Sequence, residues 1–354
     1  MTDVVLEAVG LEKRFTRKRI IGPDVVVRAV AGVDLSVRRG ETLAVVGESG
    51  CGKSTLARLL LTLMKPSAGA VLYEGRDTAD RSAADLRALR RDLQVIFQDP
   101  FSSLNPRMTV GALIEEPLRV HGIGTPETRA ARVAEMLDKV GLRPGHADRY
   151  PHEFSGGQRQ RVGIARALAC GPTVVVGDEP VSALDVSIQA QIINILTALR
   201  DEMGLTLVLI AHDLAVIRHM ADRVAVMYLG RVVEEAGTDA LFARPMHPYS
   251  AALMAAIPVA AVGARPATAV VEGEPPNPVA PPPGCPFHPR CVHARHRCRT
   301  DPPELRTVGG RRVACHFAEE LTLDGVGAQT DGLSDGARRR FALLDSRTQT
   351  GGTP

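Results

Sequence analysis

A glycine-rich segment followed by Lys-Ser-Thr is the most specific chemical pattern in this sequence. Residues 47–55, Gly-Glu-Ser-Gly-Cys-Gly-Lys-Ser-Thr, match the phosphate-binding pattern G-x-x-x-x-G-K-[ST]. The glycines let successive backbone N–H groups converge on phosphate oxygens, and a following helix N-terminus adds partial positive charge. We therefore predict a nucleotide-phosphate site formed by Gly47, Glu48, Ser49, Gly50, Cys51, Gly52, Lys53, Ser54 and Thr55.

The segments on both sides of this motif have the periodicity that it requires. Residues 42–46 form a nearly continuous apolar run, which predicts a buried strand, and residues 56–61 predict the first turns of a helix. In this context Lys53 is expected to reach the β- and γ-phosphates, and Ser54 is expected to ligate Mg²⁺. The alternative is a glycine-rich turn that binds no ligand.

Two acidic residues at the end of another apolar run complete the chemistry of nucleotide hydrolysis. Residues 173–177 predict a buried strand that ends at Asp178 and Glu179. Asp178 suits a contact with Mg²⁺, either direct or through water, and Glu179 is placed to polarise an attacking water. An ordinary acidic pair at a strand end is the alternative interpretation.

Two more strand ends carry polar side chains that suit the same reaction. Gln98 follows the mostly apolar segment 93–97, which predicts a buried strand, and is placed to contact Mg²⁺ and the water. His212 follows the strand predicted at 205–210 and is placed to hold the γ-phosphate and Glu179. Taken alone, a glutamine here is more often a loop amide and a lone histidine is more often structural.

Composition indicates a globular protein of roughly two domains. The 354 residues are 45% hydrophobic and 23% charged, and the net charge of +3 is too small to indicate nucleic-acid binding. Aromatic residues are only 3%, which argues against a base-stacking surface. No apolar run is long enough to span a membrane, and the N-terminus does not resemble a signal peptide, so we expect a cytoplasmic protein.

Strands alternate with helices through most of the chain, which predicts an α/β protein with a largely parallel, doubly wound sheet. Before the phosphate motif, residues 25–27 and 33–37 predict two short strands, and Pro126 predicts a helix start.

Composition changes near residue 242, and residues 265–284 are rich in proline. We predict a nucleotide-binding domain at 1–240, an extension at 241–320 and a disordered tail at 321–354.

Together these residues resemble those of ATP-binding-cassette (ABC) ATPases. The resemblance adds Asp185 and a signature motif of Ser155, Gly156, Gly157 and Gln158, in the family's order. It implies a P-loop NTPase fold with a parallel core, an antiparallel β subdomain and a helical subdomain. It also implies head-to-tail pairing, in which the signature motif serves the partner's ATP. Phe15 matches the residue that stacks on adenine in this family, although a phenylalanine there is also consistent with the core.

The resemblance extends to the ATPases of oligopeptide and dipeptide importers, which include nickel-type members. It is carried by Phe97–Arg107, Asp178–Asp185, Met246–Tyr249 and the pattern around Cys285 and Cys291. It implies ATP hydrolysis with Mg²⁺, import of peptides, and a peripheral place on the cytoplasmic face of the membrane. The implied partners are a homologous cassette in a heterodimer, two permease subunits and, indirectly, a solute-binding protein, with no nucleic acid. The phosphate motif and Ser103–Arg107 look closer to the second of the two paired ATPases, the F type. The rival class is a soluble cassette ATPase acting on nucleic acid or ribosomes.

A cluster of cysteines near the C-terminus predicts a metal site. Thiolates are soft ligands, and a reducing compartment disfavours disulfides. The cluster could hold an iron–sulfur centre, it could hold Zn²⁺ with His288 or His316 as alternate ligands, or its members could be unligated. The resemblance favours [4Fe–4S] on Cys285, Cys291, Cys298 and Cys315.

Overall fold

The computed structural model describes residues 3–19, 22, 24–182, 184–211, 214–257 and 273–326. The chain divides into two compact units, one of Met1–Val232 with Asn277–Pro281 and one of Val233–Pro276 with Pro282–Pro354. From residue 327 onward the predicted tail lies outside the described residues, as does the predicted linker up to residue 272. Within the described ranges, no helix has the length and apolar character needed to cross a membrane.

The first unit begins with an antiparallel sheet in the strand order β2-β1-β4-β5. The prediction of two short strands at 25–27 and 33–37 is wrong, because β2 is continuous. Gly32 has a positive φ of 76° and is left unpaired between Ala31 and Val33, whose partners Glu12 and Leu11 are consecutive in β1. A bulge at a glycine therefore joins the two apolar segments into one strand. The strands are β1 (Val4–Arg17), β2 (Val25–Arg38), β4 (Ala68–Tyr73) and β5 (Arg76–Asp77).

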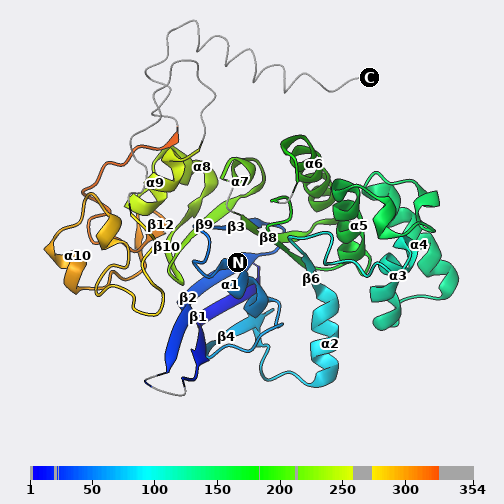
Figure 1. Ribbon diagram of the computed structural model, residues 1–354, viewed down its shortest axis with the longest axis horizontal. Coiled ribbons are helices and arrows are strands. Elements are labelled where there is room, and N and C mark those ends of the chain that lie inside the picture. The colour runs from blue at the N-terminus through cyan, green and yellow to red at the C-terminus, as the bar shows by residue number, and fades with distance from the viewer. Residues whose placement is uncertain are drawn as a thin grey trace, which may run out of the picture. The chain divides into compact units, whose positions relative to one another are not determined.

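A parallel sheet in the order β9-β3-β8-β7-β6 forms the centre of the first unit (Figure 1). All residues of β3 are buried, which explains why its sequence is apolar without alternation. In the parallel register Val46 pairs with Ala211, and Gly177 pairs with both Leu209 and Ile96. The carboxyl ends of these strands therefore meet at one edge of the sheet. The strands are β3 (Thr42–Val46), β6 (Leu93–Ile96), β7 (Val174–Asp178), β8 (Thr206–Ala211) and β9 (Arg223–Tyr228).

Helices of the first unit either follow these strands or form a separate helical region. Three helices of that region, α3, α4 and α5, pack side by side (Figure 1, green). Leu113 and Ile114 of α3 and Met136 and Leu137 of α4 are fully buried, so the apolar faces of these helices form a local core. The helices are α1 (Lys53–Leu60), α2 (Ala83–Asp92), α3 (Val110–Val120), α4 (Pro126–Lys139), α5 (Gly156–Leu168), α6 (Val186–Met203) and α7 (Leu214–Met220).

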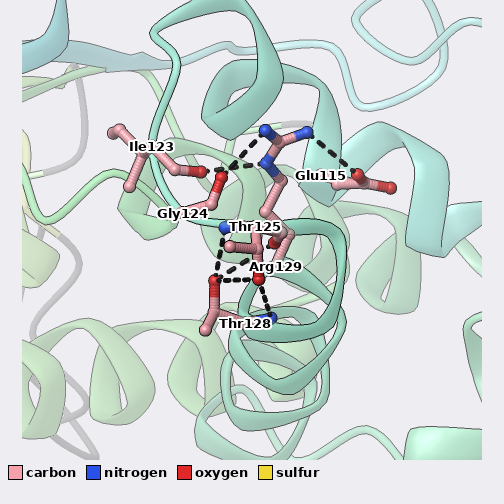
Figure 2. Close-up of polar contacts among 6 residues, drawn as sticks. All are labelled: Glu115, Ile123, Gly124, Thr125, Thr128 and Arg129. Atoms are coloured by element: carbon pink, nitrogen blue, oxygen red, sulfur yellow. Dashed lines mark hydrogen bonds and ion pairs between the residues drawn. The ribbon is translucent and has the colours of Figure 1, made fainter.

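The connection between α3 and α4 is held by a capping box and by one arginine (Figure 2). Thr125 is the N-cap of α4, and its backbone N–H donates to the hydroxyl of Thr128 at 2.8 Å. The Arg129 guanidinium donates to the carbonyls of Ile123 and Gly124, each at 2.9 Å, and lies 3.7 Å from Glu115. The helix start expected at Pro126 is confirmed, and the turn before it is fixed by side-chain hydrogen bonds.

The second unit is built around a buried carboxylate. Glu234 lies in β10 and accepts the backbone N–H groups of Met246 and His247 at 2.8 and 2.9 Å. Burial raises the pKa of Glu234, and these hydrogen bonds oppose that rise. His247 is also buried, caps the helix that follows it, and has its pKa lowered to about 3 by burial. The elements are β10 (Arg231–Gly237, within which the two units divide), α8 (Thr238–Ala243), α9 (Pro248–Ala255), α10 (His296–Thr300), β11 (Arg306–Val308) and β12 (Arg311–Val313).

Candidate nucleotide-binding site

The glycine-rich loop lies against the backbone of two other segments. A Cβ atom at Gly52 would lie 2.0 Å from the carbonyl oxygen of Ala29, and one at Gly47 would lie 2.2 Å from that of Met227. Gly52 also has a φ of 108°, a conformation that favours glycine. The packing of the loop therefore requires glycine at these two positions, independently of phosphate binding.

The loop forms one wall of a cavity of about 500 Å³, which is within the usual size of ligand pockets. Gln98 and Glu179 line the same cavity, so the fold brings together residues from three different strand ends. Ala29 of β2 also lines it, although nothing in the sequence around Ala29 indicates a binding role. The lining residues are Ala29, Ser49, Gly50, Gly52, Lys53, Ser54, Thr55, Gln98 and Glu179.

Lys53 is held inside the loop by backbone oxygens. Its side chain is buried, and the ammonium donates to the carbonyls of Gly47 at 2.7 Å and Glu48 at 3.0 Å. A buried ammonium needs such partners because its desolvation is costly. The loop therefore fixes a compact positive charge at the cavity, where it can bind phosphate oxygens.

Two of the three residues predicted to contact Mg²⁺, Ser54 and Asp178, are in direct contact with each other. The Ser54 hydroxyl, in the first turn of α1, donates to Asp178 Oδ1 at 2.9 Å. Burial raises the pKa of Asp178, while the hydrogen bond from Ser54 lowers it. A hydroxyl and a carboxylate are oxygen ligands of the kind that Mg²⁺ prefers, so this pair fits the ion.

The residues predicted to handle the attacking water are also brought together. Gln98 Nε2 donates to Glu179 Oε2 at 3.0 Å, which orients the carboxylate. Glu179 has a φ of 49°, in the left-handed region that non-glycine residues rarely adopt. Its backbone N–H donates to the carbonyl of Ile210 at 2.9 Å, so the turn is anchored to β8.

The signature motif lies at a different cavity of the same unit. Ser155 is the N-cap of α5; its Oγ accepts the Gln158 N–H at 3.4 Å, and Gln158 Oε1 accepts the Ser155 N–H at 3.0 Å. A Cβ at Gly157 would lie 2.5 Å from a methyl group of Ile188, so the helix start packs closely on α6. Gly156 follows the cap in the first turn. Ser155, Gly157 and Gln158 line a polar cavity of about 490 Å³ that also includes Arg143 and Arg161.

The remaining predicted residues of the nucleotide site are not among those that line the phosphate cavity, or lie outside the described residues. Phe15 of β1 is 43% exposed with the Lys13 ammonium 5.6 Å from its ring centroid, and it is not among the residues that line the phosphate cavity. Asp185 is the N-cap residue of α6 without a side-chain cap bond. His212 lies outside the described residues. Cys51 is buried beneath the loop, and burial raises its pKa.

The four cysteines of the second unit line one small cavity. His247 and His316 line it as well. Burial raises the pKa of Cys285 to about 12 and that of Cys291 to about 11, which favours neutral thiols in this environment. Among the described residues, no group of three or more His, Cys, Asp or Glu side chains is arranged to hold a metal ion. The fold thus gathers Cys285, Cys291, Cys298 and Cys315 around one cavity, but the described residues form no metal-binding group there, so this geometry does not support the predicted iron–sulfur centre.

Comparisons with known proteins agree with this arrangement. The family described as "ABC transporter" matches residues 30–182, and the family "Oligopeptide/dipeptide transporter, C-terminal region" matches residues 233–298. A solved structure of the ATP-binding cassette MJ0796, dimeric and bound to ADP and Pi after hydrolysis, has a TM-score of 0.59 at 32% identity. It covers 66% of this chain and 98% of that chain. Fold and site therefore define a P-loop ATPase of the ATP-binding-cassette class, as predicted.

Relatives extend the likeness over most of the chain. "Probable peptide ABC transporter ATP-binding protein y4tS" of Sinorhizobium fredii is 56% identical, over 82% of this chain and 83% of the relative. "Oligopeptide transport ATP-binding protein AppF" of Bacillus subtilis is 49% identical, over 82% and 90%. "Dipeptide transport ATP-binding protein DppF" of Escherichia coli is 46% identical, over 89% and 95%. The chain belongs to the family of ABC transporter ATP-binding proteins, and it carries the C-terminal region of the oligopeptide/dipeptide transporters.

The F type expected for this chain is a type of cassette protein. The letter belongs to names such as AppF and DppF, which are cassette proteins. It does not denote the rotary F-type ATPases.

Two glycines of the phosphate loop provide a test of its packing. Gly50→Ala places a Cβ in open space and should cost about 1–2 kcal/mol, because φ is 79° there. Gly52→Ala has the same kind of backbone strain plus a collision with the Ala29 carbonyl, and should cost about 1–3 kcal/mol more. The measurement is urea unfolding of the nucleotide-free protein. Equal losses for the two variants would show that the loop does not depend on its approach to β2.

Proposed function

We propose that this chain hydrolyses ATP to drive the import of di- or oligopeptides, as a peripheral subunit on the cytoplasmic face of a membrane. The observation that carries the hydrolytic part is the Gln98–Glu179 pair at the phosphate-loop cavity. The peptide substrate is supported by the relatives named for peptide, oligopeptide and dipeptide transport and by the matched C-terminal region.

The residues of the cavity have separate roles in this proposal. Loop N–H groups and Lys53 bind the phosphates, and Gln98 orients the Glu179 carboxylate toward a water that it polarises. Mg²⁺, held by Ser54 and Asp178 with Gln98 as a further ligand, would neutralise charge on the phosphates. His212 is proposed to hold the γ-phosphate, and Phe15 to stack on adenine.

The partners proposed for this subunit follow from the family. A homologous cassette would pair head to tail with this chain, so that Ser155, Gly157 and the rest of the signature motif serve the partner's ATP. The position of the signature motif at a cavity separate from the phosphate loop supports this arrangement. Two permease subunits would receive the closure of the dimer through residues 101–116, and a solute-binding protein would deliver the peptide.

We also propose that the four-cysteine cluster, within an extension at 241–320, holds a [4Fe–4S] centre. Its donor set is four thiols, which suit soft metals. A [4Fe–4S] centre takes one thiolate on each of four irons, so its ligands lie farther apart than those of one ion. The observation behind the proposal is that the four cysteines line one cavity.

Removing the carboxylate at Glu179 tests the hydrolytic role. Glu179→Gln keeps the shape of the side chain but cannot polarise water, so ATP should bind, turnover should fall by about 10²-fold or more, and closed dimers should accumulate. Turnover and gel filtration with ATP measure both effects. Glu202→Gln, which changes an exposed carboxylate of α6 in the same way, is the control. Normal turnover in Glu179→Gln would remove Glu179 from the reaction.

Two N-caps allow the signature motif to be tested against loss of helix stability. Ser155→Ala and Thr125→Ala each remove the side chain of a capping box, at a cost of about 1 kcal/mol. Only Ser155→Ala should lower turnover in the assembled dimer, while ATP binding at its own Lys53 site is retained. Equal turnover in the two variants, or loss of ATP at the Lys53 site, would contradict the head-to-tail arrangement.

The cysteine cluster is tested by metal analysis of anaerobically purified protein. About four irons and four sulfides per chain, with a broad absorbance that bleaches in air, are expected for [4Fe–4S]. Cys291→Ser should lose the iron and retain ATP binding, whereas Cys170→Ser, outside the cluster, should retain both. One bound zinc would favour the alternative, and folded protein with neither metal would reject a metal site.

A further inference from the structure

Gln160 is a buried amide in the middle of a packed helix face. Its exposed fraction is 2%, and its neighbours on the same face of α5, Gly157 and Ile164, are buried as well. An amide costs free energy to bury unless its hydrogen bonds are made, so a glutamine at this position needs specific partners.

Those partners are two backbone carbonyls beside the hydrolytic pair. Gln160 Nε2 donates to Pro180 O at 2.7 Å and to Phe97 O at 3.3 Å. Pro180 directly follows Glu179, and Phe97 directly precedes Gln98. Because β6 and β7 are adjacent parallel strands, their two carboxyl ends lie within reach of one amide, which uses both N–H groups.

The turn that Gln160 contacts is strained. Glu179 has a φ of 49°, which costs about 1–2 kcal/mol for an L-residue. Such a conformation persists only where several interactions determine it together. The Ser182 N–H and hydroxyl donate to the Glu179 carbonyl at 3.2 and 3.1 Å, and the Gln160 bond to Pro180 is the contribution of α5.

We propose that Gln160 is a positioning residue for ATP hydrolysis. It binds the carbonyl of Phe97, which precedes Gln98, and the carbonyl of Pro180, which follows Glu179. These bonds tie the orientation of the catalytic carboxylate to α5. The first turn of α5 is the signature motif, so a displacement of Ser155–Gln158 is transmitted along one rigid helix to the hydrolytic turn. This inference rests on the proposed ATPase function.

The chemistry of the amide determines which variants are informative. Gln160→Met keeps the length of the side chain but removes both donors, leaving the buried Pro180 carbonyl and the part-buried Phe97 carbonyl without this partner. Gln160→Glu keeps the shape but presents an acceptor to two acceptors. Gln94→Glu is the matched control, because Gln94 of β6 donates to the Arg90 carbonyl at 2.7 Å, away from the hydrolytic pair.

The experiment separates kcat from ATP binding in the full-length protein. Both Gln160 variants should lose about 10–100-fold in kcat, because misplacement of the carboxylate weakens its action on the water. The Kd for a non-hydrolysable ATP analogue should stay at the native value, as should both constants in Gln94→Glu. In a Glu179→Gln background, Gln160→Met should lower the residual turnover no further, because both changes act through one group.

Three results would overturn the assignment. They are an unchanged kcat in Gln160→Met, a loss of ATP binding in both Gln160 variants, and a multiplicative loss in the double variant. Loss of binding counts against the proposal because a positioning role leaves the phosphate site intact. A native chain without turnover dependent on Glu179 would instead refute the proposed function, so the two failures are distinguishable.

Discussion

The parallel register of β3, β8, β7 and β6 is the constraint on which the site depends. Val46, Asp178 and Ile96 end their strands at one edge, so the phosphate loop, the acidic pair and Gln98 meet without any long connection. The 2.9 Å bond from Ser54 to Asp178 joins residues that follow or end two of these strands. A shift of one residue would turn the side chains of a strand to the opposite face of the sheet and separate them.

Much of this arrangement could be predicted because the relevant signals are local. The run at 42–46, the glycine spacing at 47–52 and the acidic pair after 177 each lie in a short stretch, and each predicts both an element and a role. Parallel strands bring such stretches to one edge by a general rule, whereas the adjacency of β6 and β7 that lets Gln98 contact Glu179 is known only from the fold.

The rest depends on contacts between distant segments, which a single sequence does not display. Ala29 lines the nucleotide cavity because β2 passes beneath Gly52, and no feature around Ala29 marks that role. Gln160 lies in a polar run, residues 158–161, and it is the buried member of that run, whereas the other three are partly exposed. Its two carbonyl partners are 63 and 20 residues away, so only the fold identifies it as distinct from Gln158.

The strain at Glu179 explains why that turn needs contacts from several elements. A cost of about 1–2 kcal/mol is comparable with the net contribution of a single hydrogen bond. Pro180 disfavours the ordinary helical conformation for the residue before it, which removes one competing backbone state. Bonds from Ile210, Ser182 and Gln160 supply the remaining stabilisation, from a strand, the turn itself and α5. The net free energy of any one of these hydrogen bonds is about equal to the free-energy cost of the strained φ. The position of the carboxylate is therefore sensitive to movement of any of these elements.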